Sequence, residues 1–385
     1  MCGDVCPQGC IKFIEDEEGF FYPQIDEISC VDCGLCAKRC PAINFSYNKR
    51  VNDAIAGYAK EKSVKETGSS GGVFFLLASY IIKSGGVVYG AAFDEKFILK
   101  HYRVDEVKNI LSLCKSKYIQ SDCEKIYLKV KEDLDAEKNV IFVGTPCQCQ
   151  ALKNFIGKSK CDKLILVDFI CHGVSCQKLF NENLEWNKKK FGKIKSIEFR
   201  HKGEKVKHPH TLRLVYEKKG KEKSLLRLHY QDPYYFGFQK HITLRPSCYS
   251  CSWAKPERCS DITLADFWGI EKANIGLDSK KGVSCILLNS EKGKIVFSSI
   301  KDMLEGVNEI SIDFAMNNNH CLTQATSQPI ERDSFFIDWK KYGYDVVASK
   351  YMKPKRKWIY DLYYAIPTPV RKFVRKLMEN RMKYE

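Results

Sequence analysis

Four cysteines lie within eleven residues near the N-terminus of the chain, from Cys30 to Cys40. The four are Cys30, Cys33, Cys36 and Cys40, and together with Pro41 they form the pattern C-x2-C-x2-C-x3-C-P. Bacterial-type ferredoxins hold a 4Fe-4S cluster with this run, because thiolates at every third position of a short loop curl round one face of a cubane. Four-cysteine zinc sites usually come as two separated C-x2-C pairs instead. The spacing therefore predicts an iron-sulfur cluster.

A second, incomplete run lies upstream, where Cys2 and Cys6 precede Pro7. It matches only the last two cysteines of the pattern. In two-cluster ferredoxins the cysteine before the proline ligates the neighbouring cluster. Cys6 therefore joins the first three cysteines of the complete run, and Cys2 shares a half-site with Cys40. The predicted ligands of this module are Cys2, Cys6, Cys30, Cys33, Cys36 and Cys40.

The half-site leaves three alternatives open. The true start lies upstream of Met1, or the module holds a single cluster, or Cys10 and water complete the second site. Cys10 follows Cys6 by four residues. We expect it to be a small packed residue rather than a ligand.

The length of the chain separates this module from a larger body. Since the chain has 385 residues, a ferredoxin-like α+β module over residues 1–46 precedes a catalytic or binding body over residues 54–345. The opening residues lack the basic-then-apolar pattern of a signal peptide, and the longest apolar stretch, residues 73–82, is too short to span a bilayer. We expect a cytoplasmic, reducing compartment in which the nineteen cysteines are thiols or ligands.

The net charge of +16 is concentrated in a C-terminal tail, residues 346–385. Residues 350–385 alone hold eleven Lys and Arg against three acids. Apolar stripes at helical spacing on either side of Pro367 and Pro369, backed by basic residues, suit an anionic membrane surface or an acidic partner. A terminal helix pair docked on its own domain explains the pattern equally well. The apolar stripes are Trp358, Ile359, Leu362, Tyr363 and Ile366, then Val370, Phe373, Val374 and Leu377.

The positive charge also raises the question of nucleic-acid binding. The chain lacks a helix-turn-helix and an RNP-like aromatic strand, so we expect no nucleic acid as a partner.

The body alternates strand-like runs with helical patterns, which indicates an α/β or α+β domain around a mixed sheet. An exposed loop is expected over residues 202–210 and a linker over 49–53. Strands are predicted over 87–93, 140–143, 164–170, 196–200, 212–216, 262–265 and 284–288, and helices over 72–83, 124–134, 147–156, 176–190 and 292–304.

A turn of small residues from Thr67 to Gly72 opens directly onto the apolar run at residues 73–77. Free N–H groups and the positive end of the dipole make such a helix N-terminus an anion site, and a phosphate or pyrophosphate would fit. The turn matches neither the Rossmann nor the Walker pattern. A serine N-cap with glycine packing explains it as well.

Four further cysteines lie at strand ends or in turns. Cys147 follows the strand at 140–143, Cys171 follows the run at 164–170, and Cys248 and Cys251 form a C-x2-C pair. Because the carboxyl ends of parallel strands share one edge of a sheet, these residues can converge. Their spacing alone leaves an iron-sulfur site, a zinc site and buried structural cysteines open.

The order of these motifs resembles the coenzyme F-420 hydrogenase/dehydrogenase beta-subunit family over residues 1 to about 345. The resemblance implies an α/β flavin-binding domain with its own 4Fe-4S cluster beside FAD, fed by the ferredoxin-like module, hence at least two clusters. The cluster near the flavin would be held by Cys147, Cys171, Cys248 and Cys251. FAD would be cradled by Ser69, Ser70, Gly71, Gly72, Lys117, Tyr118, Gly144 and Thr145.

Two residues are candidates for catalysis under this resemblance. Lys117 would neutralise a flavin phosphate or the reduced ring, and His172 would donate a hydrogen bond to cluster sulfur or relay a proton. A solvated lysine and a packed imidazole are the ordinary alternatives. Tyr118 and Trp268 would border the flavin, although core aromatics are the default interpretation. No ligand position matches Cys114, Cys123, Cys149, Cys161, Cys176, Cys259, Cys285 or Cys321.

The expected function is that of an anaerobic iron-sulfur flavoprotein oxidoreductase. It would exchange electrons between ferredoxin, or another redox protein, and an acceptor at FAD such as coenzyme F-420, since clusters carry single electrons and flavins carry two. The identity of the acceptor is not readable from the residues. The alternative is a non-catalytic electron-relay subunit of a larger redox complex.

Overall fold

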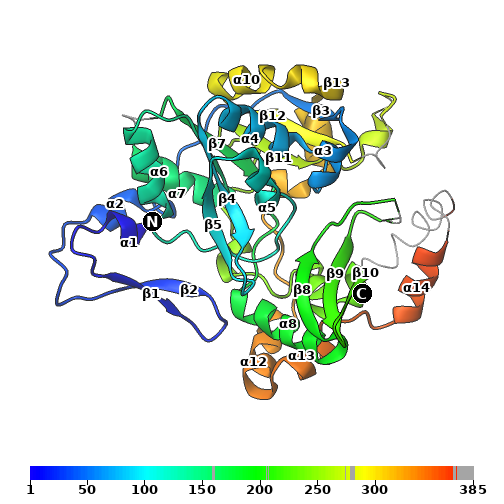
Figure 1. The fold of residues 1–385 in the computed structure, drawn as a ribbon. Coiled ribbons are helices and arrows are strands. Elements are labelled where there is room, and N and C mark those ends of the chain that lie inside the picture. The colour runs from blue at the N-terminus through cyan, green and yellow to red at the C-terminus, as the bar shows by residue number, and fades with distance from the viewer. Residues whose placement is uncertain are drawn as a thin grey trace.

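The computed structural model describes residues 1–157, 161–204, 206, 208–273, 275–277, 282–366 and 370. It has three parts, which are a small N-terminal module, a unit built on an eight-stranded sheet, and a unit built on a three-stranded sheet (Figure 1). The second predicted tail stripe, at Phe373, Val374 and Leu377, lies outside the described residues, as do Pro367 and Pro369. No helix of the described part is long and apolar enough to cross a membrane.

The large sheet is mixed, as expected. Its central strands run parallel, since β4 pairs with β6, β6 with β7 and β7 with β11, and its outer pairs are antiparallel. The spatial order is β13 (Leu304–Ser311), β3 (Asp53–Ala59), β12 (Ser284–Leu288), β11 (Ile262–Asp266), β7 (Leu164–Phe169), β6 (Val140–Val143), β4 (Val87–Phe93) and β5 (Leu99–Val104).

Helices cover both faces of this sheet, which is why its central strands are apolar on both sides. Ile141 and Ile165 face one layer, while Val140 and Phe142, displaced by one residue, face the other. The first layer contains α4 (Val73–Lys83), α5 (Ile110–Leu113) and α10 (Glu291–Ser298), with α3 (Lys62–Thr67) beside them. The second contains α6 (Ile126–Asp135), α7 (Pro146–Ile156) and α11 (Ile312–Asn318).

The smaller unit packs helices against an antiparallel sheet around a separate aromatic core. Phe180, Phe199, Tyr234 and Phe335 are fully buried there. Its strands are β8 (Lys193–Glu198), β9 (Thr211–Lys218) and β10 (Lys221–Leu228), and its helices are α8 (Gln177–Phe191), α9 (Pro233–Gln239), α12 (Arg332–Tyr342) and α13 (Tyr344–Lys350). The helix α14 (Lys357–Ala365) lies at the edge of the molecule beyond this unit (Figure 1).

The N-terminal module consists of α1 (Cys2–Val5), a hairpin of β1 (Ile11–Glu15) and β2 (Phe21–Ile25), and α2 (Leu35–Arg39). Its contacts with the body include one at α2 and one at the hairpin. Arg39 donates to the carbonyl of Asn154 on α7 (2.6 Å). At the tip of the hairpin, Glu18 pairs with Arg332, whose side chain is 5% exposed.

The structure corrects four details of the expected fold. The predicted strands at 196–200 and 212–216 belong to the separate small sheet, not to the large one. The predicted helix at 292–304 ends at Ser298, and the chain re-enters the large sheet as β13. The loop at 202–210 is not exposed throughout, because Lys202 and His210 are partly buried. The boundary at 345/346 falls inside α13, whose Val347 is fully buried, so the packed body extends past it.

Candidate functional site

A cavity of about 310 Å³ lies at the carboxyl ends of the central parallel strands. Loops after β6 and β7 and the end of β11 form one wall, which is where open α/β sheets bind ligands. The turn before α4 and the segment at 114–119 also line the cavity. Nine of the predicted site residues line this single cavity, namely Ser69, Ser70, Gly72, Lys117, Tyr118, Gly144, Thr145, Cys171 and His172.

The turn before α4 is held from both sides by hydrogen bonds within the protein. Ser69 Oγ accepts from the backbone N–H of Ser116 (2.8 Å), and Ser70 Oγ donates to the carbonyl of Val283 (2.8 Å). Gly72, at φ +82°, is the N-cap of α4 and provides no side chain to cap the helix. The first N–H groups of α4 are therefore left without a side-chain cap beside the cavity, as an anion site requires.

Gly71 differs from its neighbours, because it packs into the protein. A Cβ at Gly71 would lie 2.7 Å from the carbonyl oxygen of Gly57 and 2.7 Å from Ser284 Oγ. Its N–H donates to the same Ser284 hydroxyl (2.8 Å), and its carbonyl accepts from Ala59. Gly71 therefore allows the close approach of the turn to β3 and β12.

Lys117 and Tyr118 come from the segment that faces this turn. Lys117 Nζ donates to the carbonyl of Cys114 (2.7 Å), and burial lowers the pKa of Lys117 to about 8. The lysine is thus a poorly solvated cation on the cavity wall. The ring of Tyr118 stacks on Phe238, with centroids 4.4 Å apart, so this residue both lines the cavity and belongs to the aromatic core.

His172 follows Cys171 at the cavity wall. Burial of the ring lowers the pKa of His172, and the nearby His320 lowers this pKa further. The imidazole is therefore neutral at pH 7. It meets His241 edge-on, with centroids 5.9 Å apart, and its carbonyl accepts a hydrogen bond from Thr326 (2.7 Å).

The four predicted cysteines of the body converge behind this wall. Burial raises the pKa of Cys171 well above its usual range, and the neighbouring Cys248, Cys147 and Cys251 raise it further. Burial likewise raises the pKa of Cys248 to about 12, with added contributions from Cys147 and Cys251. Of the four, Cys171 also lines the cavity.

Cys147 is presented by the first turn of α7. This helix begins with a capping box in which Thr145 and Gln148 exchange hydrogen bonds, and Thr145 Oγ1 lies 3.1 Å from Cys147 Sγ. Gln148 Nε2 also donates to Cys123 Sγ (3.2 Å), and Cys123 in turn contacts His101 Nδ1 (3.2 Å). No sequence pattern indicated these last two residues.

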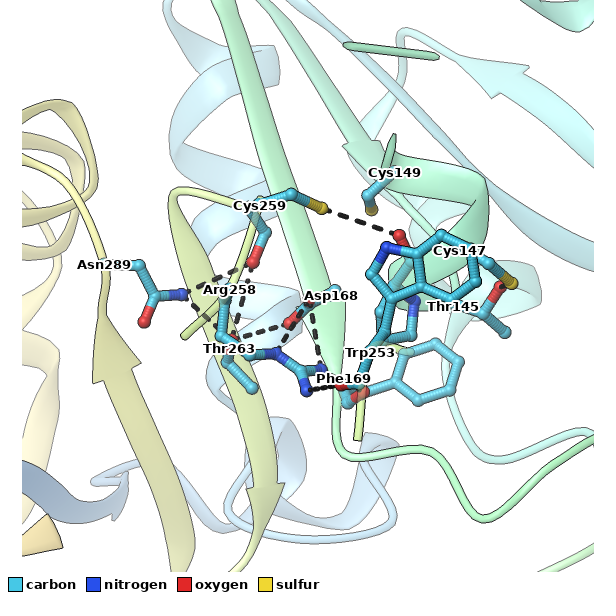
Figure 2. Close-up of polar contacts among 12 residues, drawn as sticks. Thr145, Cys147, Cys149, Asp168, Phe169, Trp253, Arg258, Cys259, Thr263 and Asn289 are labelled. Carbon is cyan, nitrogen blue, oxygen red and sulfur yellow. Dashed lines mark hydrogen bonds and ion pairs between the residues drawn. The ribbon is translucent and has the colours of Figure 1, made fainter. Parts of the chain in front are cut away.

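A buried ion pair ties together the segments that carry the other three cysteines (Figure 2). Arg258 and Asp168 are 3% and 0% exposed, and their closest approach is 3.2 Å. Arg258 also donates to the carbonyls of Trp253 (2.8 Å) and Phe169 (3.1 Å). It thereby links the loop that follows Cys251 to the end of β7, which leads to Cys171.

Hydrogen bonds to the acid complete this network. Thr263 donates to Asp168 Oδ1 (2.6 Å), and Asn289 donates to Thr263 Oγ1 (2.9 Å) (Figure 2). Burial raises the pKa of Asp168, whereas Arg258 opposes that shift. The sequence signal that could have revealed the ion pair is Asp168 itself, a charged residue inside the apolar run of β7. A buried charge of this kind needs a partner.

Cysteines of the N-terminal module lie close together at two points. Cys6 Sγ lies 3.3 Å from Cys10 Sγ, and this contact, together with burial and nearby Cys30, raises the pKa of Cys10 to about 12. Cys10 is buried, as expected, yet its sulfur belongs to the same group as the predicted ligands. Burial raises the pKa of Cys2, and Cys40 is close enough to contribute to that rise.

Neither cysteine group has the geometry of a single-ion site. Across the described ranges, no group of three or more His, Cys, Asp or Glu side chains is placed to hold one metal ion.

The structure adds cavity residues that the sequence did not indicate. Arg200 chelates Asp266 through two hydrogen bonds (2.7 and 3.0 Å) and donates to the carbonyl of Ser69 (3.2 Å). His210 stacks on Trp268, with ring centroids 5.7 Å apart, and both residues line the cavity. Arg200 and His210 escaped prediction because they come from the smaller unit, far from the sheet in sequence.

Comparisons with known proteins agree with the motifs. Residues 137–309 match the family described as the C terminus of the beta subunit of coenzyme F-420 hydrogenase/dehydrogenase, and residues 1–43 match a 4Fe-4S dicluster domain. Over residues 137–309 the chain therefore matches the coenzyme F-420 hydrogenase/dehydrogenase beta-subunit family. The resemblance inferred from the sequence is confirmed, and so is an iron-sulfur cluster domain at the N-terminus.

A curated protein and a solved structure illustrate what this chain is similar to. The coenzyme F-420-dependent sulfite reductase of Methanocaldococcus jannaschii is 26% identical over 327 residues, which are 80% of this chain and 46% of that protein. The chain thus spans about half the length of this relative. A chain of the F-420-reducing NiFe hydrogenase complex from Methanosarcina barkeri aligns with a TM-score of 0.44 and 15% identity, over 79% of this chain and 92% of that one.

Proposed function

We propose that this protein is an iron-sulfur flavoprotein oxidoreductase. It exchanges electrons between ferredoxin, or a similar redox protein, and an acceptor such as coenzyme F-420 at a bound FAD. The observation that carries the proposal is a single cavity lined both by the turn before α4 and by Cys171, a member of a four-cysteine group. A flavin held there would lie beside a cluster.

The cradle supports the FAD part of the proposal. The uncapped N-terminus of α4, the serines of its turn and Lys117 all line the cavity. Together they provide N–H donors and positive charge for a pyrophosphate. When bound, FAD supplies the conversion between single-electron transfer and hydride transfer.

The two cysteine groups support the electron path. The module contributes the cysteines of residues 2–40, and the body contributes Cys147, Cys171, Cys248 and Cys251. Helix α7 connects them, since its first turn carries Cys147 while Asn154 near its end binds the module. Asn154 Nδ2 donates to the carbonyls of Arg39 (3.1 Å) and Asn44 (2.6 Å).

The residues at the cavity have distinct roles under this proposal. Lys117 and the turn before α4 bind and orient the anionic part of the cofactor, and Tyr118 and Trp268 border its ring. His172 is neutral at pH 7, so one ring nitrogen can donate a proton and the other can accept one. It stands next to Cys171 and is our candidate for moving a proton at the reacting end of the cavity.

The test is FAD binding by anaerobically prepared apoprotein, measured through quenching of flavin fluorescence. Lys117→Met removes the cation and keeps the length of the side chain, and we expect FAD affinity to fall about tenfold. Lys100→Met, which removes an exposed lysine from β5, should leave affinity unchanged. Absence of FAD binding in the unsubstituted protein would refute the flavin assignment, and equal losses in both variants would refute the cradle.

A second candidate is an electron-relay subunit whose substrate chemistry occurs on another polypeptide. The match to this chain covers only 46% of the F-420-dependent sulfite reductase, and this favours a relay to chemistry on another polypeptide. Turnover distinguishes the two candidates. An isolated chain that oxidises reduced F-420 with ferredoxin as acceptor is an enzyme in its own right, whereas a chain that exchanges electrons only with a partner is a relay.

A further inference from the structure

Helix α14 has two faces with different surroundings, although none of its residues is buried. Tyr360 and Tyr364 pack on Tyr230, with ring centroids 5.2 and 5.3 Å apart, and Tyr230 donates to Asp361 (3.0 Å). These contacts fix which side of the helix meets the body. The tail helix is therefore docked on its own domain along one face, which is one of the alternatives that the sequence left open.

Within the described part of the chain, the opposite face is apolar and exposed to solvent. Trp358 and Leu362 are 65% and 57% exposed, and residues four apart on a helix lie on the same side. Each is two positions away from a docked tyrosine, which turns it to the far side of the helix. An exposed Trp and Leu on a short helix are typical of helices that lie in a membrane interface.

Positive charge surrounds this face. Lys353, Lys355, Arg356 and Lys357 lead into the helix and are all exposed, while Asp361 is the one acid among residues 351–366. Residues 367–385 add six Lys and Arg against two Glu in sequence. Such a density of cations suits the anionic headgroups of a lipid leaflet.

A groove between the smaller unit and the segment before α14 extends the positive region. Its volume is about 660 Å³, which is ample for a phosphate-bearing headgroup. Lys190 lies over the ring of Trp186 at 3.4 Å, and Arg227 approaches the same ring at 5.9 Å. Asp345 also lines the groove, and it pairs with Lys189 (3.7 Å). The cations that line it are Lys190, Arg227, Lys353 and Lys357, of which Arg227 pairs with Asp232 (3.3 Å) and Lys357 with Asp361 (2.7 Å).

We propose that this protein binds to anionic membrane surfaces through the exposed face of α14 and its basic surroundings. The helix would lie in the headgroup region with Trp358 and Leu362 inserted. α14 lies at the opposite end of the molecule from the N-terminal module (Figure 1), so that bound protein would keep the module accessible to a redox partner. The inference does not depend on the cofactors.

The test is co-sedimentation of the full chain with vesicles of phosphatidylcholine alone or with about 30% phosphatidylserine. We expect binding to the anionic vesicles at about 0.1 M salt and its loss at about 1 M, where the screening length falls from about 10 to about 3 Å. The emission of Trp358 should shift to the blue on binding, and the shift should vanish in Trp358→Phe.

The matched variants are Trp358→Glu/Leu362→Glu and Ile330→Glu, the latter at a side chain that is 93% exposed elsewhere on the surface. The double variant should lose at least about tenfold in vesicle affinity with unchanged circular dichroism, and Ile330→Glu should bind normally. Failure to bind anionic vesicles, equal binding by the double variant, or binding to an acidic protein but not to vesicles would each overturn the proposal.

Discussion

Breaking the buried ion pair between Arg258 and Asp168 should destabilise the body strongly. Arg258→Met leaves the Asp168 carboxylate fully buried without its cation, and removing one partner of a buried pair costs about 3–5 kcal/mol. The hydrogen bonds to the carbonyls of Trp253 and Phe169 are lost as well. We therefore expect the free energy of unfolding of Arg258→Met to fall by about 4 kcal/mol at pH 7.

The pH dependence of that loss follows from Asp168. Burial raises the pKa of Asp168 in the folded protein, and removing Arg258 should raise it further, because Arg258 opposes the shift. The folded variant then binds more protons than the unfolded chain between the ordinary pKa of Asp and the raised one. Its stability should therefore fall as pH rises through that window, and part of the loss should be recovered from pH 7 to about 5.

The assay is urea unfolding of the apoprotein under anaerobic conditions, followed by iron analysis of the reconstituted variant. The control is Lys131→Met, which breaks an exposed pair with Asp135 (2.9 Å) and should cost less than about 1 kcal/mol. Because Arg258 also holds the loop after Cys251, the variant should lose iron from the body while keeping the cluster of the module. A loss of stability below about 1 kcal/mol would refute the reasoning.

Three further predictions concern the cofactor site and the module. Since burial lowers the pKa of Lys117 to about 8, its positive charge is lost as pH rises through that value, so FAD affinity should decline above pH 8 in the unsubstituted protein. It should stay flat in Lys117→Met, and a shared decline would contradict the role of this cation. Cys251→Ser should lose about four iron atoms per chain and stop reduction of FAD by ferredoxin, whereas Cys285→Ser, at a buried cysteine without a predicted ligand role, should keep both. Glu18→Gln should leave Arg332 with only the longer contact to exposed Asp333 (3.6 Å), and slow electron transfer from module to flavin at unchanged iron content. An unchanged rate of electron transfer would show that the contact of the hairpin tip with the body does not affect this transfer.

The strands that position the cavity were the most predictable part of the fold. β4, β6 and β12 are short continuous apolar runs bounded by polar or glycine residues, and their limits agree with those expected. β3 was missed because Asp53–Ala59 is rich in Ala and Gly, which have low strand propensity, and its place between β12 and β13 comes from tertiary packing.

Local motifs singled out nine residues that line one cavity, whereas contacts distant in sequence were not predictable. The turn ending at Gly72 and the segment from Gly144 follow directly from small residues at element ends. Arg200 reaches the cavity from the smaller unit, and its pairing with Asp266 depends on how the two units pack. Arg258 lies 90 residues from Asp168, so only the unusual charge within β7 could have hinted at the pair.

The most direct test of the central claim is the content of iron and FAD in protein purified and reconstituted under anaerobic conditions. The account predicts one FAD and about eight or more iron atoms per chain, with absorption that dithionite bleaches. Zinc in place of iron, or iron confined to about four atoms per chain with no FAD, would contradict it.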